Sequence, residues 1–273
     1  MSANKSDKEL AFLHELYVAT DWGERFAALM DEHVELPKEG RILYVASGTG
    51  SHAMALQEHI ADDVRLVCVD ESEERLELAR VKAMAVRAET EFRQTQLEAL
   101  WFRDDQFEMV LGDGSLIAPH RLPAMLSEMV RVAVPGGAVA LSLVTASSFG
   151  EFFSIYWEAL RNTGLEAHGS DVEALIKELP TVSEIEALAA REGLDAVTSW
   201  TSVEEFDYES GEEFLNAPLI TDFLLKSWLE SLPDAETQDR ISQEIGRLID
   251  EERQDMDFSL SVKATLVTGR KTE

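Results

Sequence analysis

The chain has 273 residues and a formal net charge of −29, because 24 Lys and Arg residues stand against 53 Asp and Glu residues. Hydrophobic residues make up 45% of the chain, which excludes an intrinsically disordered or collagen-like protein and provides for a sizeable core. So acidic a chain repels phosphate backbones, and we expect no nucleic-acid partner. The single cysteine, Cys68, excludes an intrachain disulfide. The six histidines are dispersed, so no metal site is indicated.

The N-terminal stretch over residues 7–33 is expected to be helical, because apolar side chains recur in it at helical spacing. Tyr17 and Trp22 belong to this pattern, which favours core positions for both over contact with a ligand. Neither here nor later does an apolar segment reach the length of a signal peptide or a membrane span. We therefore expect a cytoplasmic protein.

From residue 41 onward, short apolar runs alternate with helical stretches. The runs begin at Ile42, Val64, Phe92, Phe107 and Ala138. Strand and helix in this rhythm predict an α/β fold with a doubly wound, mostly parallel sheet that is covered on both faces.

The second half of the chain has a looser pattern. Helices are expected at 151–161 and 183–192, a strand region at 195–208, and a helical insertion at 209–257. The final run, 258–267, alternates apolar and polar residues, which is typical of an antiparallel strand with one buried face. We therefore predict about seven strands, with the helical insertion before the last one.

The strongest local signal is a glycine-rich turn between a buried strand and a helix, in the segment ILYVASGTGSHA at 42–53. Glycine allows the sharp turn and lets a ligand approach the main chain. Asp70 ends the next apolar run, 20 residues after Gly50, where a carboxylate can accept both hydroxyls of a ribose. This pattern predicts nucleoside binding, although Gly48-x-Gly50-x-x-Ala53 also fits a dinucleotide site or a plain tight turn.

Four segments in order resemble the class I S-adenosylmethionine-dependent methyltransferases of the small-molecule type. They are ILYVASGTG at 42–50, VCVDESEERLELAR at 67–80, LEALWFRDDQFEMV at 97–110 and EMVRVAVPGG at 128–137. The last segment resembles the turn that precedes the fifth strand in that family. The resemblance covers about residues 40–145, and it implies a Rossmann-like methyltransferase domain over 41–273 behind a helical cover at 1–40.

The resemblance also implies where S-adenosyl-L-methionine would bind. Asp70 would hold the ribose hydroxyls, and Asp113 would lie near the transferable methyl group. The residues expected at the cofactor are Tyr17, Ala46, Ser47, Gly48, Thr49, Gly50, Asp70, Glu71, Ser72, Gln96, Leu97, Gly112 and Asp113. Glu71 and Ser72 would lie beside the adenine, and Gln96 and Leu97 would read its edge.

Three positions depart from the family's pattern. Tyr44 stands where an acidic residue commonly helps to hold the amino group of the cofactor. Ala46 replaces the first glycine of the motif, and Gln96 replaces the usual aspartate. Tyr44 is the substantive loss, and it keeps open a second reading, in which the protein binds the cofactor or a nucleoside without catalysis, as a sensor or partner protein.

Methyl transfer from a sulfonium needs alignment and exclusion of water, and a base only where the acceptor carries a proton. Asp113 and His120 are the catalytic candidates. Asp113 follows the end of a strand, although Gly112-Asp113-Gly114 is also a turn composition. His120 could act as a base near neutral pH, but it could equally be a surface or capping residue, and His52 is expected to pack.

The predicted function is methyl transfer from S-adenosyl-L-methionine to a small-molecule acceptor. Aromatic residues cluster at 149–157 and again at 214–228, and if both clusters line one cavity the acceptor is apolar or aromatic. A nicotinamide-dependent oxidoreductase would share the glycine turn and Asp70, but it leaves the segments at 97–110 and 128–137 unexplained.

Overall fold

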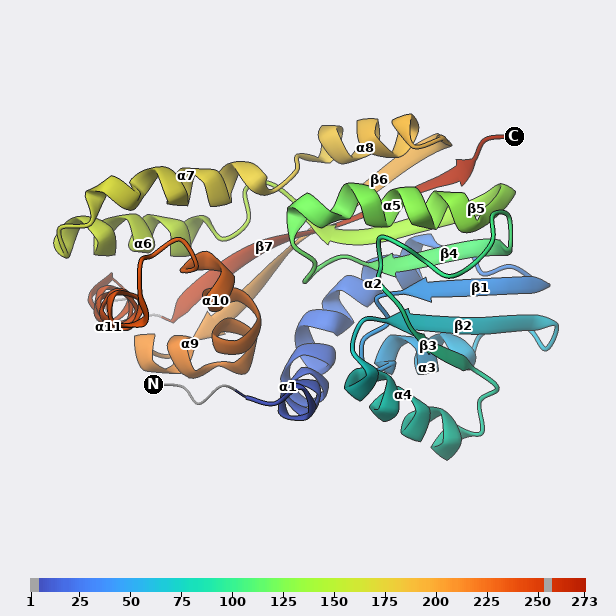
Figure 1. The fold of residues 1–273 in the computed structure, drawn as a ribbon, viewed down its shortest axis with the longest axis horizontal. Coiled ribbons are helices and arrows are strands. Elements are labelled where there is room, and N and C mark those ends of the chain that lie inside the picture. Colours follow the sequence, from blue (N-terminus) through green and yellow to red (C-terminus); the bar gives the residue numbers. More distant parts are fainter. Residues whose placement is uncertain (1–4, 253–256) are drawn as a thin grey trace. The chain divides into compact units, whose positions relative to one another are not determined.

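The computed structural model describes residues 5–252 and 257–273, which form a seven-stranded mixed sheet with flanking helices (Figure 1). The strand order is β3-β2-β1-β4-β5-β7-β6. The strands are β1 (Gly40–Val45), β2 (Val64–Asp70), β3 (Glu91–Gln94), β4 (Phe107–Asp113), β5 (Ala133–Val144), β6 (Leu194–Tyr208) and β7 (Phe258–Lys271).

The pairing of the strands confirms the predicted fold class. Strands β1 to β5 pair in parallel, and β7 pairs antiparallel with β5, so that Val139 lies opposite Gly269. The chain runs outward from β1 to β3 and then returns to place β4 on the other side of β1. This reversal of strand order opens a crevice at the carboxyl ends of β1 and β4, where open α/β sheets bind ligands.

The helices fall into two compact units, each described by itself. The sheet unit comprises Lys5–Val144, Thr181–Ser202 and Ala264–Glu273, and the aromatic unit comprises Thr145–Pro180 and Val203–Lys263. In the sheet unit the helices are α1 (Asp7–Leu13), η1 (His14–Trp22, a π-helix), α2 (Gly23–His33), α3 (Ser51–Gln57), α4 (Glu73–Val86), η2 (Pro119–Arg121, a 3-10 turn), α5 (Leu122–Val132) and α8 (Val182–Arg191).

In the aromatic unit the helices are α6 (Gly150–Asn162), η3 (Glu166–His168), α7 (Gly169–Glu178), α9 (Gly211–Asn216), η4 (Leu219–Leu224), α10 (Leu225–Trp228) and α11 (Ala235–Glu252). The predicted insertion at 209–257 thus contains four helical segments, α9, η4, α10 and α11, joined by short turns over the residues that the structure describes. The predicted division of the chain at residue 40 stays a prediction.

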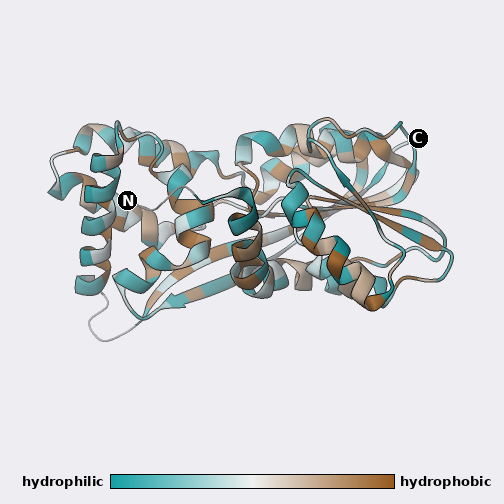
Figure 2. Ribbon diagram, turned by 60° about the horizontal axis from the view of Figure 1, so that its bottom comes forward, coloured by the Kyte–Doolittle hydropathy of each residue, from teal (hydrophilic) through white to brown (hydrophobic). Residues whose placement is uncertain are grey.

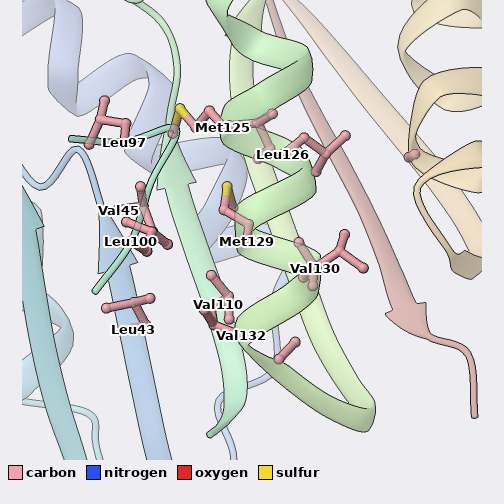
Figure 3. Packing of buried hydrophobic residues seen from close by; sticks show 14 of the residues in the cluster. Leu43, Val45, Leu97, Leu100, Val110, Met125, Leu126, Met129, Val130 and Val132 are labelled. Atoms are coloured by element: carbon pink, nitrogen blue, oxygen red, sulfur yellow. The ribbon is translucent and has the colours of Figure 1, made fainter. Parts of the chain in front are cut away.

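One face of the sheet packs against α5. Proline at the start of α5 and apolar residues at i, i+3, i+4 and i+7 give this helix a continuous buried stripe, Leu122, Met125, Leu126 and Met129. The stripe contacts Leu43, Val45 and Val110 in one buried cluster (Figure 3).

Because strand side chains alternate between faces, Ile42 and Tyr44 point away from α5. That opposite face is covered by α2 and α3, since Met30 of α2, Leu56 of α3 and Leu111 of β4 line one small cavity there. Figure 2 shows that helices of this molecule carry both hydrophilic and hydrophobic residues. The alternation therefore directs Tyr44 toward the helices that frame the glycine turn.

In the N-terminal helices, the predicted core position is confirmed for Trp22 and wrong for Tyr17. Trp22 is buried as expected, stacks on Phe26 and donates its Nε1–H to Ser115 Oγ at 2.9 Å. Tyr17, however, is 51% exposed and not in the core. The π-helical turns of η1 explain the difference, because each wider turn shifts the buried face by about one residue from the α-helical register.

The aromatic unit has a core of its own. Phe152 and Trp228 lie 4.2 Å apart between ring centroids, and Phe214 packs on Phe152 at 6.0 Å. Most aromatic residues of the two predicted clusters therefore meet in one buried cluster, in which their role is packing, whereas Trp157 is 49% exposed. The buried members are Phe149, Phe152, Phe153, Tyr156, Phe214 and Trp228. Among residues 5–252 and 257–273, no helix is both long and apolar enough to cross a bilayer.

Replacing Met125 by Ala should lower the free energy of unfolding by about 2–5 kcal/mol, because the side chain is fully buried between α5 and the sheet. Met84→Ala is the matched control, since that methionine is 72% exposed on α4 and should change stability little. Urea unfolding followed by circular dichroism measures both. Equal losses in the two variants would contradict the placement of α5.

Candidate active site

The glycine turn connects β1 to α3 through backbone conformations that only some residues adopt readily. Ala46, Gly48 and Gly50 have φ angles of +57°, +57° and +77°. Ser47 N–H donates to Val69 O on β2 at 3.0 Å, and Gly50 N–H donates to Ser47 O at 3.0 Å. At Gly48 an added Cβ would lie 2.8 Å from His14 Cε1, so a side chain there would collide with the imidazole. The turn is therefore tightly closed against η1 as well as against β2.

Asp70 lies at the carboxyl end of β2, directly behind this turn, and is 2% exposed. Its Oδ2 accepts Gly48 N–H at 2.9 Å, and its Oδ1 accepts Ser72 N–H at 2.9 Å. Arg75 Nη1 is 3.6 Å from Oδ1. Asp70 thus fixes the turn, a role that the sequence analysis missed, and each oxygen keeps a second lone pair for a ligand hydroxyl.

A cavity of about 340 Å³ opens at the turn, within the range of small-molecule sites. Five of the predicted residues line it, namely Ala46, Ser47, Gly48, Thr49 and Asp113. Its other lining residues are His14, Ala19, Gly23, Glu24, Ala27, Ala28, Asp31, Tyr44, Ser51, His52 and Ala55. Gly50 and Asp70 are not among the lining residues; they contact the wall through hydrogen bonds with Ser47 and Gly48, and their contact with the cofactor stays a prediction.

The residues predicted at the adenine lie outside the cavity wall. Glu71 forms a bidentate ion pair with Arg121, at 2.6 and 3.1 Å, and Ser72 caps α4 by accepting Arg75 N–H. Gln96 is exposed, and the Leu97 side chain is buried in the core cluster. Their contacts with adenine stay a prediction, and for Leu97 only the backbone is available.

The remaining predicted residues lie in three separate places. Gly112 packs against α5, where an added Cβ would meet Met129 Cε at 2.7 Å, so its small size serves packing. His120 is exposed on the 3-10 turn η2 and is not part of the cavity wall. Tyr17 is also outside that wall. Of the two catalytic candidates, the structure brings only Asp113 to the cavity.

Asp113 is half-buried at the carboxyl end of β4, with Oδ1 accepting Ser115 N–H at 3.0 Å. Burial raises the pKa of this carboxyl, and the charge of Asp70 raises it further. The hydrogen bonds from Ser115 and the charge of His52 act in the opposite direction. The fold therefore disfavours the ionised form of Asp113, and a raised pKa of this kind is typical of functional carboxylates.

Three side chains that the sequence analysis did not place in the site form a hydrogen-bonded chain along the cavity wall. Tyr44 Oη lies 2.8 Å from His52 Nδ1, and His52 Nε2 lies 2.9 Å from Asp31 Oδ1. Burial, followed by the charge of Asp113, holds the pKa of Tyr44 well above its usual range. Tyr44 and His52 could have been paired from the strand-turn-helix pattern, whereas Asp31 depends on how α2 packs.

Residues 42–137 match the family described as a methyltransferase domain. The chain is 32% identical over 146 residues to demethylmenaquinone methyltransferase of Deinococcus radiodurans, covering 52% of this chain and 59% of that protein. It is 37% identical over 126 residues to the ubiquinone/menaquinone biosynthesis C-methyltransferase UbiE of Geobacter sulfurreducens, covering 43% and 48%. The chain thus spans about half the length of the curated relatives it matches.

Two solved structures share the fold. The YcgJ protein of Bacillus subtilis superposes with a TM-score of 0.60 at 22% identity, covering 92% of this chain and 99% of that one. BH2331 of Bacillus halodurans C-125 gives a TM-score of 0.58 at 18% identity, covering 92% and 100%.

Ala46→Gly should raise the free energy of unfolding by about 1 kcal/mol, because alanine at φ +57° carries a steric cost that glycine avoids. Ala85→Gly is the matched control, since Ala85 is exposed within α4, where glycine costs about 0.5–1 kcal/mol. Urea titrations measure both. A loss of stability in both variants would contradict the left-handed turn at Ala46.

Proposed function

We propose that this chain, whose residues 42–137 match a methyltransferase-domain family, is a class I methyltransferase that transfers a methyl group from S-adenosylmethionine to a small molecule. The observation that carries the proposal is the cavity at the glycine turn, which lies at the switch point between β1 and β4 within the matched segment. The antiparallel β7 between β5 and β6 also departs from the order 3-2-1-4-5-6 of dinucleotide-binding folds, which disfavours an oxidoreductase.

The residues of the cavity fit the cofactor in polarity and charge. Thr49 is 1% exposed, and within the described part of the chain its Oγ1 has no hydrogen-bond partner. A ligand hydroxyl or carboxylate at the turn would satisfy it. Asp31 and Asp113 bring negative charge to the same wall, which suits a ligand with ammonium and sulfonium groups.

The bound cofactor would supply a methyl group already activated by the positive sulfur. The residues of this chain then have to orient that ligand, exclude water and handle any proton of the acceptor. Asp70 and the backbone of Gly48 set the position of the nucleoside end. Asp113, at the end of β4, is placed to accept a proton from an acceptor hydroxyl or acidic carbon, and its raised pKa suits that task.

For the acceptor we propose an apolar or aromatic small molecule, of which a quinol is the first to test. The support is the sequence similarity to enzymes named for demethylmenaquinone and for ubiquinone/menaquinone biosynthesis. A cytoplasmic location stays a prediction from the sequence.

The full chain should bind S-adenosylhomocysteine at micromolar concentration in calorimetry and should not bind NADH. Asp70→Asn should weaken that binding by about 1–3 kcal/mol, because one acceptor oxygen becomes an amide that cannot accept a ribose hydroxyl. Asp62→Asn, in an exposed loop before β2, is the control and should bind like the parent chain.

Thermal unfolding separates loss of binding from loss of the fold in these variants. Binding of NADH in place of S-adenosylhomocysteine would overturn the proposal. Tight binding of S-adenosylhomocysteine without turnover of any acceptor would favour the cofactor-binding sensor instead.

Asp113→Asn should lower turnover of an identified acceptor and at the same time stabilise the fold above pH 3.8, the usual pKa of this group. Because the pKa of Asp113 is higher in the folded than in the unfolded state, ionisation of this carboxyl lowers the free energy of unfolding as the pH rises from 3.8 to the raised pKa. Asparagine does not ionise, so the variant avoids this loss of stability. Unfolding free energies between pH 3 and pH 8 measure the effect.

Asp195→Asn, an exposed carboxylate on β6, should leave that pH dependence unchanged. A variant at Asp113 that loses turnover and stability together at neutral pH would contradict the assigned burial of its charge.

A further inference from the structure

The chain of Asp31, His52 and Tyr44 joins three separate elements at one wall of the cavity. Asp31 comes from α2, His52 from the first turn of α3, and Tyr44 from β1. The His52 side chain is 11% exposed and Tyr44 is buried, whereas Asp31 is largely exposed. These three hydrogen-bonded side chains thus run from the surface to the end of the central strand.

The hydrogen-bond partners determine where the protons of this chain lie. An ionised carboxylate only accepts, so His52 Nε2 carries a proton and donates it to Asp31. In the neutral imidazole, Nδ1 is then an acceptor, and the hydroxyl of Tyr44 donates to it. The Tyr44 oxygen keeps its lone pairs, so this hydroxyl presents an acceptor rather than a donor to a ligand.

The surroundings of Tyr44 select the charge of that ligand. Asp113 and Asp31 are the charged groups that act on it, and both carboxylates line the same cavity. A neutral acceptor oxygen in a cavity that carboxylates line favours a cationic donor and disfavours an anion. A primary ammonium group meets this requirement, because it carries one positive charge and three N–H donors.

We propose that Tyr44, positioned by His52 and Asp31, accepts a hydrogen bond from the α-ammonium group of S-adenosylmethionine. These three side chains would together take the role of the acidic residue that the family pattern has at the position of Tyr44. The inference rests on the proposed function. Tyr44 is then the binding residue for the amino end of the cofactor, while His52 and Asp31 act through it.

The test compares two ligands that differ in one group. S-adenosylhomocysteine has the amino group, and its deaminated analogue keeps the nucleoside, thioether and carboxylate without it. Tyr44→Phe in the full chain should weaken binding of S-adenosylhomocysteine about tenfold to a hundredfold and change binding of the analogue less than twofold. Tyr156→Phe is the matched control, a buried tyrosine of the aromatic unit, and should leave both affinities unchanged.

A second variant supplies a readout that a purely structural role of His52 would not change. His52→Phe keeps a ring but removes the hydrogen bond that orients the Tyr44 hydroxyl, so it should weaken binding of S-adenosylhomocysteine and change binding of the deaminated analogue less than twofold. If Tyr44→Phe proves unstable in thermal unfolding, this variant carries the test alone.

The outcomes separate this inference from the proposed function. If the folded parent chain binds neither ligand, both are overturned. If it binds both ligands but Tyr44→Phe or His52→Phe weakens them equally, only the role of Tyr44 and its two partners is overturned. Selective loss of affinity for the amino-bearing ligand in both variants is the expected result.

Discussion

The hydrogen bond from Gly48 N–H to the Asp70 carboxylate joins the ends of two adjacent central strands, and the candidate site depends on it. It holds the turn in its left-handed conformations and so determines where α3 begins. From that start, His52 reaches back to Tyr44 on the strand that precedes the turn. Loosening this one bond would therefore displace the cavity wall as well as the turn itself. The negative charge of Asp70 is stabilised in return by two backbone donors.

The charge of the cavity wall links ligand binding to stability. Asp31, Asp113 and Glu24 line it, and among the lining residues that the structure describes none is Lys or Arg. A buried carboxylate without a cation costs folding free energy, as the raised pKa of Asp113 indicates. A cationic ligand would offset that cost, so its binding should stabilise the sheet unit beyond the gain from apolar contacts. The negative charge of such a site favours cationic ligands over neutral or anionic ligands of the same shape.

Local sequence patterns were enough to predict the strands, the glycine turn and the antiparallel last strand, because each depends on residues within a few positions of one another. The N-terminal helix shows the limit, since a π-helix changes the register of a stripe that otherwise fits α-helical spacing, and Tyr17 therefore lies at the surface. Asp31 shows another limit. Its distance to His52 is set by how α2 packs on the sheet, which no local pattern encodes.

Tyr44 illustrates why a departure from a motif is weak evidence for loss of function. Judged by residue type, tyrosine in place of an acid removes a negative charge from the end of β1. Judged by its contacts, the hydroxyl is held as an acceptor by His52, whose tautomer is set in turn by Asp31, and a carboxylate at Asp113 lies near it. Carboxylates on neighbouring elements, Asp31 on α2 and Asp113 on β4, supply negative charge to the same cavity. A binding site is defined by the donors, acceptors and charge that it presents, and several residue combinations can supply the same set.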